Sequence, residues 1–296
     1  MTIWLNCEDN SRTYTKKNYL LDAAKRLGMV KVIGRPDPDI LVRDLKTRVD
    51  EPIEYVLNIE PFVKFVSGGS FTGIWEIDMV LDRHELSPSN WIYSDTVFVA
   101  NNTFPSRMLA HKHLAEVLFQ ACDPIIHRVK LDIKPEFDFV FSGSTGQDFY
   151  DKREAYLKKI KELFSFADFG KNHRPQKYVE YLNKARIQFV QSGTNKNAPT
   201  GYLAQRFFEC LAIGPVLTNY HPDLYELGLE EDVDYMCFRT MEEMVKKANI
   251  LLADDDLRER IRVSGRKKAL LLHTYSHRLI SIINKIREHD ASRPAK

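Results

Sequence analysis

The sequence has few cysteines and no long apolar run, and these two features exclude several classes of protein. Its 296 residues include only four cysteines, Cys7, Cys122, Cys210 and Cys237, and none lies in a CxxC or cysteine–histidine pattern. We therefore expect free thiols in a reducing compartment, and no structural zinc site or disulfide framework. No window approaches the run of about 18 apolar residues that a transmembrane helix needs, so no membrane span is predicted.

Strong charge of one sign is also missing. The formal net charge is +2, which neither requires nor excludes nucleic acid as a partner. The apolar run at residues 1–9 is short and has no basic leader, which argues against a signal peptide and predicts a cytoplasmic protein. With 44% apolar and 28% charged residues, the chain has enough apolar side chains to form real cores.

Strand-like and helix-like segments alternate twice along the chain. In the first half, short apolar runs predict strands, and residues 15–27 and 106–120 have the period of helices. The predicted strands of this half are 3–5, 40–42, 54–58, 77–81 and 96–100. Residues 67–73 are rich in glycine and serine and predict a loop, and residues 122–135 contain two prolines and predict a connector.

The second alternation begins after this connector. Strands are predicted at 137–141, 166–169 and 187–191, and helices at 151–164, 178–185, 241–252, 255–272 and 276–289. Asp254 or Asp255 is a plausible N-cap of the helix that follows. Two rounds of β–α alternation indicate an α/β protein with two open, mostly parallel sheets.

The segment from Gly201 to Asn219 carries the most functional information. It predicts a helix over 201–213, preceded by a polar loop at 192–200 and followed by a strand at 215–218. A helix that begins after a strand and a loop offers unpaired N–H groups to an anion. Glu209 lies two turns into that helix, a geometry suited to a nucleoside diphosphate and its ribose. The alternative is a surface ion pair between Arg206 and Glu209 at i,i+3.

These residues resemble a known family. The block Arg206-Phe-Phe-Glu-Cys-Leu-Ala-Ile-Gly-Pro-Val-Leu is similar to the R-x-F-E-x-x-A-x-G block of GT-B glycosyltransferases, and within them to the group 1 enzymes that resemble spore-maturation (CgeB-like) proteins. The resemblance covers roughly residues 122–286. It implies two Rossmann-like domains that face each other across a cleft: residues 1–130 on the acceptor side, 131–275 for the nucleotide-sugar, and 276–296 as a closing helix and tail that cross back to the first domain.

The resemblance also implies roles for residues of the expected helix. Glu209 matches the carboxylate that holds the ribose hydroxyls, and Arg206 would neutralise a phosphate. The N–H groups of Gly201, Tyr202 and Leu203 would bind the diphosphate. Many group 1 enzymes carry a sugar-facing Glu eight positions before the ribose Glu, and here that position is Gly201.

Other loops of the second domain would complete the donor site. Gly143 and Ser144 would let the backbone approach the donor closely, because only small residues permit such an approach. Tyr178 lies where the base-binding loop of the family falls. Without the sugar-facing Glu, recognition of the sugar must come from elsewhere, with Thr200 among the candidates.

Catalytic residues are harder to find in the sequence. An inverting enzyme needs a base for the acceptor hydroxyl, and Asp82 and His84 are the candidates because they follow a predicted strand. The alternative is an ordinary solvated loop. The leaving diphosphate can be balanced by a helix dipole and Arg206, so neither a metal nor a cofactor besides the donor is expected. The short sequence Asp37-Pro-Asp39 favours a turn over a metal site.

The sequence therefore predicts a metal-independent glycosyltransferase that moves a hexose-type sugar from a nucleotide donor, favoured as a UDP-sugar, to an acceptor hydroxyl. The acceptor stays open between a modified base in DNA, a polysaccharide and a small molecule, and so does retention or inversion at the sugar. One rival is a nucleotide-sugar epimerase of the same fold, and another is a non-enzymatic coat or binding protein.

Overall fold

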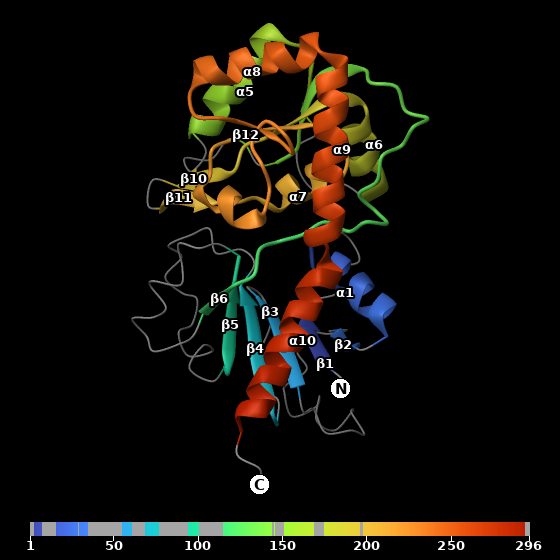
Figure 1. Cartoon of the computed structure of the whole chain (residues 1–296), viewed down its shortest axis with the longest axis vertical. Helices are drawn as coiled ribbons and strands as arrows, with labels where there is room; N and C mark the ends of the chain where they lie inside the picture. The colour runs from blue at the N-terminus through green and yellow to red at the C-terminus, as the bar shows by residue number, and fades with distance from the viewer. Residues whose placement is uncertain are drawn as a thin grey trace. The chain divides into compact units, whose positions relative to one another are not determined.

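The structure is a computed structural model that describes the chain in segments. The described residues are 3–7, 16–28, 30–34, 55–60, 69–76, 94–100, 115–143, 145, 151–168, 175–195 and 198–293. The chain forms two compact units, of which the first combines residues 1–119 with 275–296 and the second comprises residues 120–274. Each unit contains a parallel sheet (Figure 1).

The first unit is built on a six-stranded sheet in the order β2-β1-β3-β4-β5-β6, in which all neighbours are parallel. Val56, Leu57 and Ile59 are fully buried, as expected for a strand that is covered on both faces. The strands are β1 (Ile3–Cys7), β2 (Val30–Gly34), β3 (Tyr55–Glu60), β4 (Phe71–Glu76), β5 (Thr96–Val99) and β6 (Ala115–Val117).

Two predictions for this unit were wrong. The expected glycine-rich loop 67–73 overlaps β4, because Phe71 and its neighbours along the strand are buried and Gly73 leaves room for the side chains of Phe71 and Leu57. The expected helix 106–120 is contradicted at its end, where residues 115–117 pair with β5. The predicted strands 40–42 and 77–81 lie outside the described residues.

Helix α10 (Tyr275–Ser292) returns from the end of the chain to the first unit, as predicted. Its Tyr275 stacks on Tyr19 of α1 (Lys16–Leu27) with ring centroids 6.0 Å apart. Near its other end, Asp290 accepts a hydrogen bond of 2.8 Å from the Tyr55 hydroxyl of β3. The helix therefore lies along the sheet and belongs to its core (Figure 1).

The second unit has a five-stranded parallel sheet in the order β13-β12-β9-β7-β8. In chain order this is the doubly wound arrangement 2-1-3-4-5, in which the direction of winding reverses between β7 and β9. The strands are β7 (Phe137–Phe141), β8 (Phe166–Asp168), β9 (Ala185–Val190), β12 (Val216–Asn219) and β13 (Met236–Phe238).

Helices cover this second sheet. Phe139 and Phe141 of β7 point to one core together with Leu157 and Ile160 of α5, because alternate residues of a strand face the same side. Asp254 is the N-cap of α9, where its carboxylate accepts from Leu257 N at 2.8 Å, so that prediction is confirmed. The helices are α5 (Asp151–Leu163), α6 (Pro175–Asn183), α7 (Gln205–Leu211), α8 (Met241–Ala253) and α9 (Asp255–Leu272), and a 3-10 helix spans Pro222–Leu227.

The expected loop and helix around residue 201 need correction. Instead of a loop over 192–200, strands β10 (Gly193–Asn195) and β11 (Ala198–Tyr202) form an antiparallel hairpin. Helix α7 begins at Gln205 and not at Gly201, because Gly201 and Tyr202 belong to β11 and Ala204 still has extended backbone angles. In the part of the chain that the structure describes, no helix combines the length and apolar character needed to cross a membrane.

Candidate functional site

The point where winding reverses in the second sheet defines the candidate site. In open α/β sheets, ligands bind beyond the carboxyl ends of the strands at such a point. Here β7 continues into Ser142 and Gly143, and β9 continues into Gln191 and Ser192. Helix α7 follows the hairpin that leaves β9, so it brings Arg206 and Glu209 to the same edge.

Glu209 lies at the centre of a buried polar cluster. The Tyr178 hydroxyl donates to its Oε2 at 2.9 Å, and the Gln205 side-chain amide donates to its Oε1 at 2.6 Å. Its side chain is only 8% exposed. The structure thus brings Tyr178 and Glu209 together, two residues that were predicted separately. Burial next to Glu209 raises the pKa of the Tyr178 hydroxyl well above its usual value, so this hydroxyl stays protonated and can donate.

His127 joins this cluster and was not predicted from the sequence. It is fully buried, and its Nε2 lies 3.5 Å from Glu209 Oε1. Its ring meets that of Tyr178 edge-on, with centroids 6.4 Å apart. The segment that contains His127 has no helical or strand period, so the sequence carries no signal for this contact.

Arg206 is held at the end of β7. Its Nη1 donates to the Ser142 carbonyl, and its guanidinium lies 5.2 Å from the centroid of the Phe141 ring. A Cβ at Gly143 would overlap this guanidinium. Gly143 therefore gives space to Arg206, and its approach to the donor stays a prediction.

Arg153 adds a second cation that was not predicted as a site residue. Its side chain is 99% buried in α5, where Nε and Nη2 donate to the Gln191 side-chain and main-chain oxygens, both at 3.1 Å. Its guanidinium is 5.7 Å from the same Phe141 ring. Two positive charges thus flank the ends of β7 and β9, where an anionic group would be stabilised.

Hydrogen bonds through Ser192 hold the end of β9 and the start of α7 in place. The Ser192 main-chain N–H donates to Asn219 Oδ1 at 2.7 Å, and the Ala204 N–H donates to Ser192 Oγ at 3.3 Å. Leu203 is buried in the core, so only its backbone could meet a ligand. The backbone of Thr200, Gly201 and Tyr202 forms the end of strand β11.

The remaining predicted site residues cannot be placed. Asp82, His84 and Ser144 lie outside the described residues. Within the described ranges, no group of three or more His, Cys, Asp and Glu side chains is arranged to hold a metal ion. Cys122, Cys210 and Cys237 are buried, and burial raises the pKa of the Cys210 and Cys237 thiols above its usual value.

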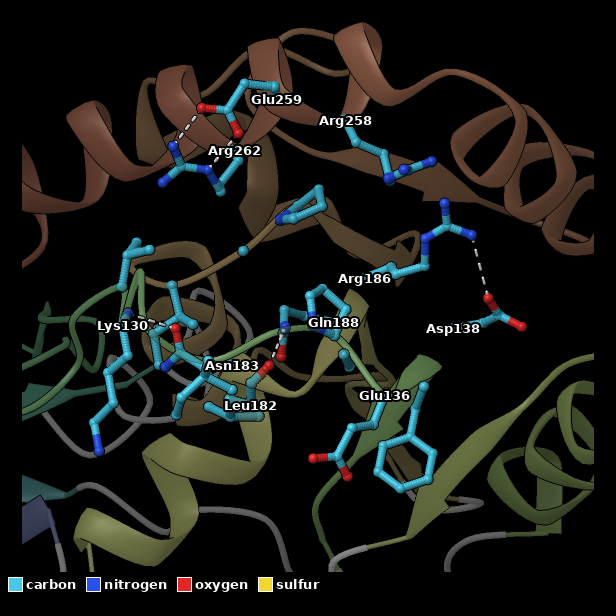
Figure 2. Close-up of a pocket in the computed structure, with 18 of the residues that line it drawn as sticks. Lys130, Glu136, Asp138, Leu182, Asn183, Arg186, Gln188, Arg258, Glu259 and Arg262 are labelled. Atoms are coloured by element: carbon cyan, nitrogen blue, oxygen red, sulfur yellow. Dashed lines mark hydrogen bonds and ion pairs between the residues drawn. The ribbon is translucent and has the colours of Figure 1, made fainter.

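A cavity of about 820 Å³ lies at the opposite edge of the second sheet. It is lined by residues where strands begin, including Phe137, Ala185 and Pro215. Figure 2 shows two ion pairs in its lining, with Arg262 on Glu259 and Arg186 turned to Asp138. Because these four charges are already paired and the cavity is at the amino ends of the strands, the carboxyl edge is the better candidate for a functional site.

The comparisons with known proteins agree with this architecture. A family model described as glycosyl transferase-like matches residues 124–284, more than half of the chain, and the chain belongs to this family. Its fold is that of GT-B glycosyltransferases. The narrower resemblance to CgeB-like proteins stays a prediction. A search of curated proteins finds no match.

Solved structures resemble the chain over nearly its whole length. Sucrose-phosphate synthase of Thermosynechococcus elongatus has a TM-score of 0.68 at 9% identity, with 99% of this chain and 100% of that chain covered. AviGT4, a glycosyltransferase involved in avilamycin A biosynthesis, has a TM-score of 0.65 at 12% identity, with 99% of both chains covered. HepE of Anabaena in complex with UDP has a TM-score of 0.60 at 10% identity, with 97% and 99% covered.

Proposed function

We propose that this protein is a glycosyltransferase that moves a hexose-type sugar from a UDP-sugar to an acceptor hydroxyl. The observation that carries the proposal is the polar cluster around Glu209, which places a carboxylate and two guanidinium groups at the switch point of the second sheet. The chain that forms this sheet belongs to a glycosyl transferase-like family. HepE, which shares the fold, is known in complexes with UDP and UDP-glucose. These complexes support UDP as the nucleotide.

In this proposal each part of the site has a chemical task. Glu209 accepts hydrogen bonds from the ribose hydroxyls, and its fixed orientation lowers the cost of binding them. Arg206 balances the negative charge that develops on the leaving diphosphate, with Arg153 adding to the positive field. Gly143, Ser144 and the backbone of residues 200–203 approach the diphosphate and the sugar.

The first unit would bind the acceptor. Asp82 and His84 remain the candidates for the base that takes the acceptor proton, which an inverting enzyme requires. The acceptor class stays open between a base in DNA, a polysaccharide and a small molecule.

A thermal-shift screen tests the donor class. We expect one of the UDP-, GDP-, ADP-, dTDP- and CMP-sugars, with UDP favoured, to raise the melting temperature with or without divalent metal. A ligand at about 100 times its dissociation constant adds about 2.7 kcal/mol to the free energy of unfolding. If none of the nucleotide-sugars raised the melting temperature, the result would argue for a non-enzymatic protein. Interconversion of the donor sugar without transfer would argue for an epimerase.

The substitution Glu209→Gln tests the site itself. Removing the charge while keeping the shape should weaken UDP binding about 10- to 100-fold, since hydrogen bonds to charged groups contribute about 1.5–3 kcal/mol. Isothermal titration calorimetry measures the change. Glu226→Gln, an exposed position in the same unit, is the matched control and should bind UDP as the unaltered protein does. Equal affinity in both variants would remove Glu209 from the site.

A further inference from the structure

The turn that precedes the first strand of the second unit holds an imidazole in one orientation. The Asp123 carboxylate accepts from the main-chain N–H groups of Ile125 and Ile126 at 2.8 and 3.1 Å. The Asp123 N–H in turn donates to His127 Nδ1 at 2.9 Å. Asp123 and His127 are both fully buried. The turn therefore fixes the ring through bonds that involve no ligand.

The same bonds decide which nitrogen carries the proton. Because Nδ1 accepts from Asp123, the neutral ring carries its hydrogen on Nε2, the nitrogen that faces Glu209 Oε1 at 3.5 Å. Burial lowers the pKa of the imidazole, which favours this neutral form near pH 7. His127 thus presents a positive N–H edge to the carboxylate without a full buried charge.

The segment around His127 is clamped to its neighbours on both sides. Asn183, at the end of α6, accepts from Lys130 N at 2.7 Å (Figure 2). It also donates to the Arg128 carbonyl at 3.2 Å. Arg266 of α9 donates to the carbonyls of Ala212 and His127. His127 is therefore tied to α6, which carries Tyr178, and to the end of the segment that carries Glu209.

We infer that His127 is a positioning residue of the nucleotide site, which orients the Glu209 carboxylate toward the ribose hydroxyls together with Tyr178 and Gln205. The inference rests on the proposed function. Tyr178 donates to Oε2, while Gln205 and the N–H edge of His127 lie against Oε1. A carboxylate has about four lone-pair sites, so these contacts leave capacity for a ribose hydroxyl.

Two substitutions separate this role from simple packing. His127→Gln keeps an N–H donor at the position of Nε2 and should bind UDP within about twofold of the unaltered protein. His127→Asn keeps an acceptor for the Asp123 N–H but cannot reach Glu209, and should weaken UDP binding about tenfold, as expected for loss of one contact to a charged group. Both variants lose ring volume, and His127→Gln also removes the acceptor of the buried Asp123 N–H. The melting temperatures, measured in parallel, should therefore fall for both variants and at least as much for His127→Gln, so lower stability alone would not explain weaker UDP binding by His127→Asn.

A ligand without ribose hydroxyls completes the test. With 2′,3′-dideoxy-UDP, the two variants should bind equally, because Glu209 then has nothing to hold. Equal UDP affinity of the Gln and Asn variants, with Glu209→Gln still weakening UDP, would overturn the role of His127 and leave the proposed function intact. Failure of the unaltered protein to bind UDP would overturn the proposed function and this inference together.

Discussion

At the scale of single residues, the candidate site depends on side chains that hold one another in place. Glu209 is buried and receives hydrogen bonds from Tyr178 and Gln205, so it is also part of the packing of the second unit. Arg206 is placed by the Ser142 carbonyl and the Phe141 ring. Removal of a group here changes the orientation of its neighbours as well as its own contact with a ligand.

Gly143→Ala tests how Arg206 is placed. The new methyl group would overlap the guanidinium of Arg206, which must move because the far end of a flexible side chain yields more easily than backbone. We expect UDP binding to weaken by about tenfold, since one hydrogen bond to a charged group is worth about 1.5–3 kcal/mol. Calorimetric titration with UDP measures it.

A second glycine provides the control. Gly28, in the first unit, has φ +62 and nothing within 4 Å of an added Cβ. Gly28→Ala should cost about 1 kcal/mol of stability through backbone strain and leave UDP affinity unchanged. If Gly143→Ala also bound UDP normally, the position of Arg206 would not matter for the nucleotide.

At the scale of elements, helix α7 is short and depends on its neighbours. It contains seven residues and has no side-chain N-cap, so its own bonds stabilise it little. Five consecutive residues, from Phe207 to Leu211, are buried, and α9 packs against it. The position of Glu209 is therefore set by tertiary packing more than by the helix itself.

Gly265→Ala tests that packing. Alanine favours a helix by about 1 kcal/mol over glycine, yet a Cβ at Gly265 would lie 2.7 Å from Leu211 Cδ1 and would overlap the Asp234 carbonyl. Backbone cannot move aside cheaply, so we expect the melting temperature to fall by an amount equivalent to about 1–3 kcal/mol. Circular dichroism on heating measures it.

The exposed position Lys267 on the same helix is the matched control, and Lys267→Ala should change the stability by less than about 0.5 kcal/mol. An alanine at 265 that raised the melting temperature would show that helix propensity outweighs the close approach of α9 to its neighbours.

At the scale of the whole molecule, the strands of both sheets follow the same order, and the last helix belongs to the same unit as the first strands. The first sheet has the order β2-β1-β3-β4-β5-β6, and the second begins its own order in the same way. The last helix belongs to the first unit, to which it adds the buried side chains of Leu279, Ile282, Ile283 and Ile286.

A chain that ends at Thr274 tests this arrangement. Full burial of an aliphatic side chain contributes about 1.5–3 kcal/mol, so loss of these four removes about 6–12 kcal/mol, comparable to the whole stability of a domain. We expect limited proteolysis to cleave within residues 1–119 of the shortened chain and to spare residues 120–274, as mass spectrometry would show.

Ile280→Ala in the full chain is the control, because Ile280 is 45% exposed on the same helix. Resistance of residues 1–119 to protease in the shortened chain would show that the first unit folds without α10.

Local regularities of the sequence determined much of the fold. The apolar pattern of 137–141, the helical period of 255–272 and the cap at Asp254 depend on neighbours a few residues away, so they could be predicted correctly. The alternation of strands and helices likewise indicated two parallel sheets. The block from Arg206 to Leu217 indicated the glycosyltransferase family for the same reason, because it is contiguous.

Only the tertiary structure decided which residues meet. Strands β4 and β6 and the β10–β11 hairpin form through pairing with distant or following strands, which local propensity does not specify. Tyr178 and His127 lie 31 and 82 positions before Glu209, and burial in one core brings all three together. The side-chain contacts that orient a carboxylate are long-range, and for that reason the sequence predicted Glu209 but not the imidazole beside it.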